Sequence, residues 1–179
     1  MVRKAVGADV AALTTLIGRY AAKGIMLPRT NAEIFERLRD FFVYTEDDVI
    51  RGACALNLCE DNLAEIRSLA VARGHTGKGI GRKLVEACLD EARAMGIKKV
   101  FALTYQTGFF KRLGFKAVNK DVLPQKIWQD CIKCAKFPSC DENAVTLELV
   151  NLEPGLDSGE KKPPKVKREK RRAGKKLRR

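Results

Sequence analysis

Residues 63–97 read LAEIRSLAVARGHTGKGIGRKLVEACLDEARAMGI, and this stretch decides the fold. Its middle, TGKGIG at 76–81, places three glycines immediately before an apolar-periodic segment. Glycines at a helix N-terminus leave unpaired N–H groups accessible, so a phosphate can approach the backbone closely. Two common phosphate motifs do not fit. A mononucleotide P-loop needs Ser or Thr after Lys78, where Gly79 stands, and the dinucleotide fingerprint needs a glycine at the position of Arg82.

The two flanks of this loop predict a strand before it and a helix after it. Alternation with a period of two predicts a strand that carries Glu65, Arg67, Leu69 and Val71 on one face. After the loop, apolar residues recur at helical spacing as far as Gly96, namely Leu84, Val85, Cys88, Leu89, Ala92 and Met95.

The other patterns predict a single α/β domain. Two helices are expected first, over 10–22 after a capping Asp9, and from Thr30 or Asn31 to Asp40. Further elements are expected in this order: a strand hairpin at 40–46 and 49–58, a strand at 98–104, a helix at 107–113, a strand from Phe115 and a strand at 144–150. This order predicts a mixed sheet with helices on both faces.

The run from residue 50 to 119 resembles the GNAT acetyltransferase superfamily. The family's loop, (Gln/Arg)-x-x-Gly-x-(Gly/Ala), corresponds to residues 76–81, with Thr76 in place of Gln or Arg. A later family element, aromatic-x-x-x-Gly-Phe, corresponds to residues 110–115. The resemblance implies a mixed, mostly antiparallel sheet and acetyl-CoA as co-substrate.

The resemblance also implies how acetyl-CoA binds. Backbone amides from Gly77 to Gly81 would hold its pyrophosphate, with Lys78 and Arg82 adding positive charge. The preceding strand end would pair with the pantetheine arm, and one N–H there would donate to the thioester oxygen as charge develops. The residues expected at the coenzyme are Leu69, Ala70, Val71, Thr76, Gly77, Lys78, Gly79, Ile80 and Gly81.

Residues 3–150 are similar to the short, acetyltransferase-only form of the N-acetylglutamate synthases. The similarity includes stretches outside the coenzyme loop, such as GIMLPRT (24–30), LRDFFV (38–43) and LPQKIWQDC (123–131). It implies acetyl transfer to the α-amine of L-glutamate. An acetyltransferase for another amine, or a non-enzymatic binding module, is the alternative.

Within this resemblance, four residues are candidates for chemistry. Glu65 is expected to be the base that deprotonates the ammonium, or else a surface carboxylate paired with a nearby Arg. Many family members protonate the leaving thiolate with a Tyr where Phe110 stands, so Tyr105 is the nearest replacement, or else a packing aromatic. Arg29 is expected to bind a glutamate carboxylate through its guanidinium fork, or else to be a surface residue at a helix entrance, and Arg67 is the second candidate for a carboxylate.

The remaining histidine and cysteines point to structure rather than chemistry. His75 is expected to be a satisfied or exposed loop residue. Cys131, Cys134 and Cys140 have the spacing of zinc ligands, but no fourth Cys or His follows them nearby. We expect reduced cysteines and no metal, although His75 or an Asp could complete a site in three dimensions.

The charge of the chain is concentrated at one end. Residues 161–179 contain twelve Lys or Arg and one Glu, which accounts for +11 of the net +13 and leaves +2 for residues 1–160. We expect a domain over 1–150 and a disordered linker and basic tail over 151–179, with at most weak nucleic-acid contact. With no apolar run long enough to cross a membrane and no signal peptide, a cytoplasmic protein is expected. The sequence leaves a homodimer open.

Overall fold

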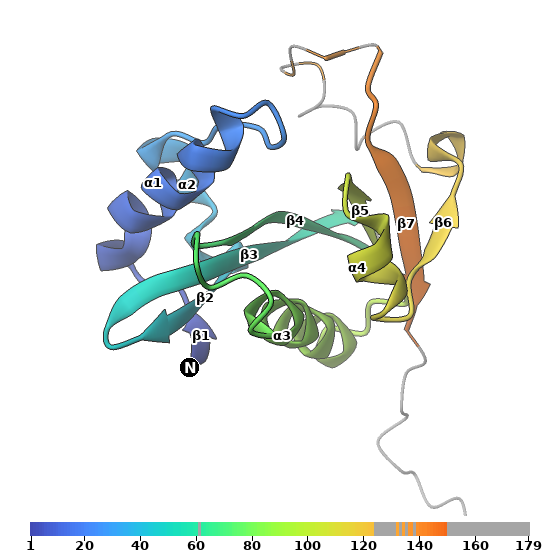
Figure 1. The fold of residues 1–179 in the computed structure, drawn as a ribbon. Helices are drawn as coiled ribbons and strands as arrows, with labels where there is room; N and C mark the ends of the chain where they lie inside the picture. The colour runs from blue at the N-terminus through green and yellow to red at the C-terminus, as the bar shows by residue number, and fades with distance from the viewer. Residues whose placement is uncertain (61, 124–131, 133, 135, 138, 150–179) are drawn as a thin grey trace, which may run out of the picture.

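The computed structural model describes residues 1–60, 62–123, 132, 134, 136–137 and 139–149 (Figure 1). The predicted linker and tail at 151–179 lie outside the described residues, and so does Cys131. The domain boundary and the role of the tail therefore stay predictions.

A seven-stranded mixed sheet forms the centre of the described chain (Figure 1). Its strands, in spatial order, are β1 (Val2–Lys4), β2 (Phe41–Glu46), β3 (Val49–Glu60), β4 (Leu63–Val71), β5 (Lys99–Thr104), β7 (Asn143–Glu148) and β6 (Lys116–Val118). All neighbours are antiparallel except β4 and β5, which are parallel. A parallel pair needs a crossover between its strands, and α3 (Ile80–Ala94) supplies it.

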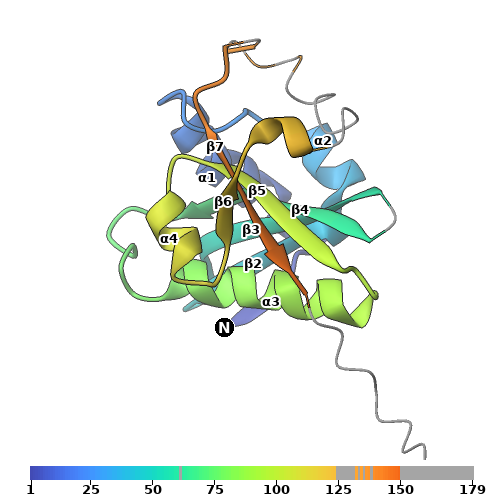
Figure 2. The ribbon, with the colours of Figure 1, turned by 90° about the vertical axis from the view of Figure 1, so that its right-hand side faces the viewer.

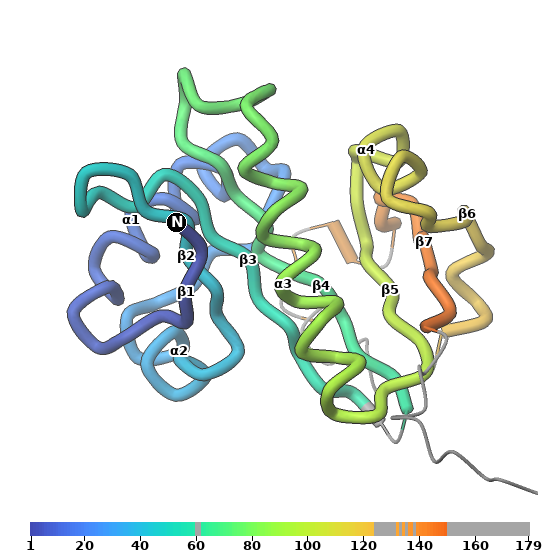
Figure 3. Tube along the Cα trace, turned by 90° about the horizontal axis from the view of Figure 1, so that it is seen from below, coloured from blue at the N-terminus to red at the C-terminus, as the bar shows by residue number. Residues whose placement is uncertain are grey.

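Helices cover both faces of this sheet, as the element order predicts. α1 (Val10–Ala21) and α2 (Asn31–Glu36) lie on one face, and α3 and α4 (Thr107–Lys111) on the other. Strand β3 shows the division, because Ala53 and Ala55 join the core under α1 while Cys54 and Leu56 join the core under α3. Figure 3 shows α3 lying over β3 and β4, with β5, β7 and β6 to one side. Short 3-10 turns at Gly7–Asp9, Leu38–Asp40 and Lys120–Val122 complete the described elements.

The N-terminal region differs from expectation in two ways. Residues Val2–Lys4 form an edge strand that pairs with β2. The sequence did not suggest a strand here, because two of these three residues are charged. Asp9 immediately precedes α1, yet its side chain does not cap that helix. The carboxylate instead accepts from the Val6 N–H at 2.8 Å and binds the Arg3 guanidinium at 2.6 and 3.0 Å. It therefore fixes the 3-10 turn to β1.

A β-bulge changes the faces of β4 near its end. Ala55 of β3 is opposite Arg67, but Ala53 is opposite Ala70, so β4 contains one extra residue in this interval. Ser68 has φ of +52°, the left-handed conformation that such an irregularity needs. One extra residue exchanges the faces of everything that follows. Leu69 and Val71 consequently pack toward α3, whereas Glu65 and Arg67 face the opposite side.

This corrects the expectation that Glu65 shares a face with Leu69 and Val71. Ala64 and Ile66, on either side of Glu65, are buried in the core under α3, so Glu65 points away from that core. The predicted shared face of Glu65 and Arg67 is retained, because both precede the bulge.

Strands β4 and β5 pair only at their beginnings. The paired residues are Leu63 with Lys99, Ala64 with Val100, and Glu65 with Phe101. Beyond these pairs β5 continues beside β7, as Figure 2 shows from the side of β5, β6 and β7. Among the described residues, the second half of β4 therefore has no strand partner on the side of β5, and we call this side its free edge.

Candidate active site

A cavity of about 810 Å³ lies where β4 and β5 separate. Its walls come from β4, the glycine loop, the first turn of α3, the end of β5, α4, the loop between α1 and α2, and the residue before β7. Small-molecule sites typically enclose roughly 300–1,000 Å³. The separation of two parallel strands thus produces a cavity of ligand size in the middle of the fold.

The bulge divides the lining of this cavity into two parts. The part that we call the loop half includes Leu69, Val71, Gly79, Gly81 and Phe109. The part that we call the acceptor half lies on the sheet face opposite α3 and includes Arg29, Glu65, Arg67, Tyr105 and Glu142. Because the edge of β4 is free here, both of its faces reach the same cavity.

The glycine loop has the conformation that an anion-binding loop needs. Gly77 and Gly79 have φ of +79° and +77°, and the space where their Cβ atoms would lie is open. Helix α3 begins directly after Gly79, whose carbonyl accepts from the Lys83 N–H at 3.1 Å. The first N–H groups of a helix have no intrahelical acceptor, so this loop presents donors and the positive end of α3.

Seven of the nine residues expected at the coenzyme line the cavity: Leu69, Val71, Thr76, Gly77, Gly79, Ile80 and Gly81. Ala70 and Lys78 do not belong to its lining. The Ala70 side chain is buried in the core under α1, and Lys78 is exposed. Arg82 lines the cavity, and its guanidinium also binds Glu86 one turn later at 2.7 Å.

Both arginines expected at the substrate line the acceptor half. Arg29 comes from the loop between α1 and α2, next to Met26 and Leu27. Arg67 comes from β4 and lies 3.8 Å from the Asp40 carboxylate, with 11% of its side chain exposed. Burial raises the pKa of Asp40, and the Arg67 charge opposes that rise. Arg67 therefore already has an acidic neighbour, and a ligand carboxylate would be a second one.

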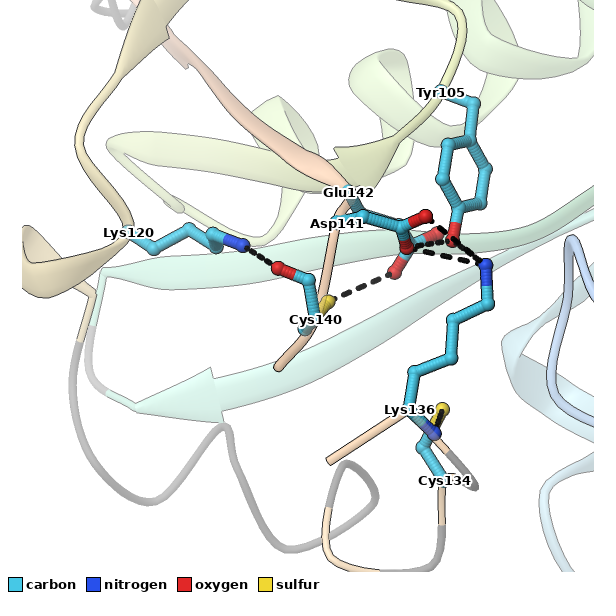
Figure 4. Close-up of polar contacts among 7 residues, drawn as sticks. All are labelled: Tyr105, Lys120, Cys134, Lys136, Cys140, Asp141 and Glu142. Atoms are coloured by element: carbon cyan, nitrogen blue, oxygen red, sulfur yellow. Dashed lines mark hydrogen bonds and ion pairs between the residues drawn. The ribbon is translucent and has the colours of Figure 1, made fainter. Parts of the chain in front are cut away.

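Tyr105 is held by a network of three side chains (Figure 4). Its hydroxyl donates to Asp141 at 2.5 Å and accepts from the Lys136 ammonium at 2.7 Å. Lys136 also binds the two Asp141 oxygens at 3.1 and 3.2 Å. Burial, and then the bond to Asp141, raise the pKa of Tyr105, so the phenol stays protonated. The hydroxyl is thus a retained proton donor at the cavity, although its proton points to Asp141.

Glu142 lines the acceptor half, and the sequence did not indicate it. It immediately precedes β7, in a segment with no helical or alternating pattern. Glu142 lies near Tyr105 because Thr104 of β5 pairs with Asn143 of β7, and these two strands are far apart in the chain. Burial raises the pKa of this carboxyl, against the opposing charges of Lys136 and Lys120.

Phe110 is a core residue, consistent with its lack of a proton to donate. It is 3% exposed and packs edge to face on Phe109 and Phe115, with ring centroids 5.1 Å apart in each case. Tyr20 of α1 also lines the cavity, and the sequence did not indicate it. Its hydroxyl donates to the Val71 carbonyl at the end of β4.

His75 lies at the rim of the cavity, with Nε2 3.3 Å from the Glu46 carboxylate, as expected for a satisfied loop histidine.

Two features are absent from the described residues. No helix among them is long and apolar enough to cross a membrane. Within the same ranges, no cluster of three His, Cys, Asp or Glu side chains could hold a metal ion. Cys131 of the C-x2-C-x5-C run lies outside these ranges, so the expectation of reduced cysteines there stays a prediction.

The profile described as Acetyltransferase (GNAT) family matches residues 17–115, more than half of the chain. The chain belongs to the GNAT acetyltransferase family. An uncharacterized N-acetyltransferase of Chlorobaculum tepidum is 45% identical over 148 residues, covering 83% of this chain and 96% of that protein. An amino-acid acetyltransferase of Mycobacterium tuberculosis is 33% identical over 133 residues, covering 73% of this chain and 76% of that protein.

Solved structures agree with the GNAT fold. The N-acetylglutamate synthase of Neisseria gonorrhoeae, in complex with coenzyme A and N-acetyl-glutamate, matches with a TM-score of 0.75 and 27% identity. The match covers 84% of this chain and 35% of that enzyme. A Mycobacterium tuberculosis protein in complex with CoA matches with a TM-score of 0.72 and 30% identity, over 84% of this chain and 99% of that one.

GNAT enzymes use acetyl-CoA as co-substrate, and the loop half fits this molecule. The open Cβ positions of Gly77 and Gly79 leave room for a pyrophosphate against the backbone. A Cβ at Gly81 would lie 3.5 Å from the Phe109 ring and 3.7 Å from Val71, so side chains here would narrow the passage between β4 and α4. The free edge of β4 offers backbone groups to an extended chain.

Proposed function

We propose that this acetyltransferase moves an acetyl group from acetyl-CoA to the α-amine of L-glutamate. The observation that carries the proposal is the acceptor half. Arg29 and Arg67 line the cavity there, together with the side chains of Glu65 and Glu142. Two cations suit a substrate with two carboxylates, and an Arg fork binds a carboxylate bidentately. The names of the related amino-acid acetyltransferases support the same substrate class.

The geometry supports a direct transfer. Acetyl-CoA would supply an activated thioester, held by the glycine loop and by the edge of β4. Leu69, the first of the expected coenzyme residues after the bulge at Ser68, lines the cavity. An N–H aimed at the thioester oxygen would stabilise the negative charge that develops during attack.

Two protons must move during this reaction. The ammonium of the amino acid must lose one before it can attack, and Glu65 is the base expected from the sequence. The departing thiolate must gain one or leave without it, and Tyr105 is the proposed donor because its phenol is retained in the protonated form. For that role the Tyr105 proton would have to turn from Asp141 to the thiolate.

A panel of acceptors tests the proposal. The full chain is incubated with acetyl-CoA and each of L-glutamate, L-glutamine, L-aspartate, other amino acids and a peptide with a free N-terminus. Thiol release and the acetylated product are both measured. We expect the highest kcat/KM with L-glutamate. Preference for an amino acid without a side-chain carboxylate, or for the peptide, would refute glutamate and leave the acetyltransferase assignment in place.

Other expectations about the whole protein have the standing of proposals. A cytoplasmic location fits the proposed substrates, acetyl-CoA and a free amino acid. Weak nucleic-acid contact rests on the charge of residues 161–179, which lie outside the described residues. A homodimer stays open, and light scattering of the full chain would decide it.

A further inference from the structure

Tyr20 connects helix α1 to the end of strand β4. It lies in the last turn of α1, and its ring packs against the core under that helix. Its hydroxyl donates to the carbonyl of Val71, the last residue of β4, which follows 51 positions later in the chain. Both residues line the cavity. One side chain therefore ties the first helix to the strand end at which acetyl-CoA is expected.

The backbone of Val71 points to the free edge of β4. Val71 pairs with Gly52 of β3, and one position further on the Ala72 N–H donates to the Arg51 carbonyl at 2.7 Å. Hydrogen-bonded and non-hydrogen-bonded pairs alternate in an antiparallel ladder, so the pair of Val71 with Gly52 is a non-hydrogen-bonded one. The Val71 N–H and carbonyl consequently point away from β3, and the bond from Tyr20 agrees with this direction. A carbonyl oxygen has two lone pairs, so it can accept a second bond from a ligand N–H.

The backbone of Tyr20 holds the start of the loop between α1 and α2. We call this loop, residues 22–30, the acceptor loop, because Arg29 belongs to the acceptor half of the cavity. The Tyr20 carbonyl accepts from the N–H groups of Lys23 and Ile25, at 3.1 and 3.4 Å. Tyr20 thus anchors the acceptor loop through its main chain and the end of β4 through its hydroxyl.

We propose that Tyr20 is a positioning residue for acetyl-CoA. Its hydroxyl fixes the Val71 peptide so that the free edge of β4 can pair with the amides of the pantetheine arm. Each of these amides carries one donor and one acceptor, so the pairing depends on the direction of the backbone groups that it meets. The inference rests on the proposed function in placing the coenzyme at this edge, though not on glutamate as the acceptor.

Two probes that differ by the pantetheine arm test the proposal on the full chain. Tyr20→Phe keeps the ring in its core position and removes only the hydroxyl. We expect the Kd of coenzyme A, measured by calorimetry, and the KM of acetyl-CoA to rise by about 3- to 10-fold, the usual contribution of one neutral hydrogen bond. The adenosine bisphosphate fragment of coenzyme A lacks the pantetheine arm and cannot reach Val71. Its Kd should therefore be the same in the variant and in the unaltered protein.

Tyr44→Phe is the matched control. Tyr44 of β2 is also a partly buried tyrosine, but it packs against the core under α3 and is not among the described residues that line the cavity. Its loss of a hydroxyl should leave the affinities for both probes unchanged. Urea unfolding of each variant gives the effect on stability separately from the effect on binding.

Three results would overturn the proposal. They are unchanged binding of coenzyme A by Tyr20→Phe, equal weakening of coenzyme A and of the fragment, and a loss confined to kcat. The second would show a general disturbance of the domain, and the third would place Tyr20 at the reacting atoms instead. If the unaltered protein does not bind coenzyme A, the proposed function fails as well, so the two failures are distinguishable.

Discussion

A single added methyl at Gly52 should displace the coenzyme loop. Gly52 lies in β3 directly beneath the first turns of α3. A Cβ there would lie 2.8 Å from Cγ2 of Ile80, 2.9 Å from Cδ1 of Leu84 and 3.3 Å from the carbonyl oxygen of Ala70. Carbon atoms in contact are normally about 3.5–4.0 Å apart, so the start of α3 would have to lift by roughly 1 Å.

The expected cost of Gly52→Ala follows from two opposing effects. Overpacking of a tight core typically costs about 1–3 kcal/mol. Alanine also loses less conformational freedom than glycine on folding, which returns roughly 0.5–1 kcal/mol within a strand. We therefore expect a net loss of about 1–2 kcal/mol in the free energy of unfolding. Because Ile80 directly follows Gly79, the same shift should raise the KM for acetyl-CoA.

Gly18→Ala is the matched control. Gly18 lies within α1, and the space around its Cβ position is open. The same change of side chain should therefore increase stability there by about 0.5–1 kcal/mol and leave the KM unaltered. Urea unfolding and acetyl-CoA kinetics of both variants provide the measurement. If Gly52→Ala matches Gly18→Ala in stability and in KM, the close packing of α3 on β3 is wrong.

Four further expectations concern other parts of the chain. Gly79→Glu should raise the KM for acetyl-CoA strongly. Gly74 has a similar φ of +81° but lies outside the cavity lining, so Gly74→Glu should leave the KM unchanged. Equal effects of the two variants would refute the assignment of the pyrophosphate to this loop. Arg29→Ala should lower kcat/KM for glutamate by about 30-fold or more, from a loss of ~2–5 kcal/mol, with Arg29→Lys in between and Arg19→Ala unaffected; a normal value would exclude Arg29 from the substrate site. The pKa of Asp9 is lowered by its hydrogen bond to Arg3, so its stabilisation is present above the ordinary value of 3.8 and is lost as the pH falls through the lower folded pKa. Asp9→Asn should thus cost about 1–2 kcal/mol at neutral pH, measured by urea unfolding, and a gap that persists in strong acid would contradict this. Deletion of residues 160–179 should leave acetyl transfer unchanged, and a loss of activity would show that the domain extends past residue 150.

The sequence predicted the elements whose signals are local. The glycine loop, the apolar stripe of α3 and the alternating strands are visible within short windows, and together they indicated the mixed sheet with helices on both faces. The resemblance to the GNAT superfamily, rather than these patterns, pointed to Arg29, Arg67 and the coenzyme residues, most of which line one cavity.

The features that the sequence did not reveal depend on register. A bulge adds one residue without any change in composition, so the exchange of faces at Ser68 was invisible. Glu142 follows no periodic pattern, and it becomes part of the cavity only through the pairing of β5 with β7. The edge strand β1 is short and charged, and it forms because β2 offers it a partner.

The three residue pairs between β4 and β5 also have a thermodynamic consequence for the whole molecule. Past the pair of Glu65 with Phe101, no further pairing joins β4 to β5 among the described residues. A ligand that contacts both strands in this opening would connect the part of the sheet that ends at β4 with the part that begins at β5. A ligand that binds only the folded chain adds RT ln(1 + [L]/Kd) to its stability, about 2.7 kcal/mol at one hundred times Kd. Resistance of the protein to unfolding and proteolysis should therefore rise and fall with the supply of acetyl-CoA, which links its lifetime to the metabolic state around it.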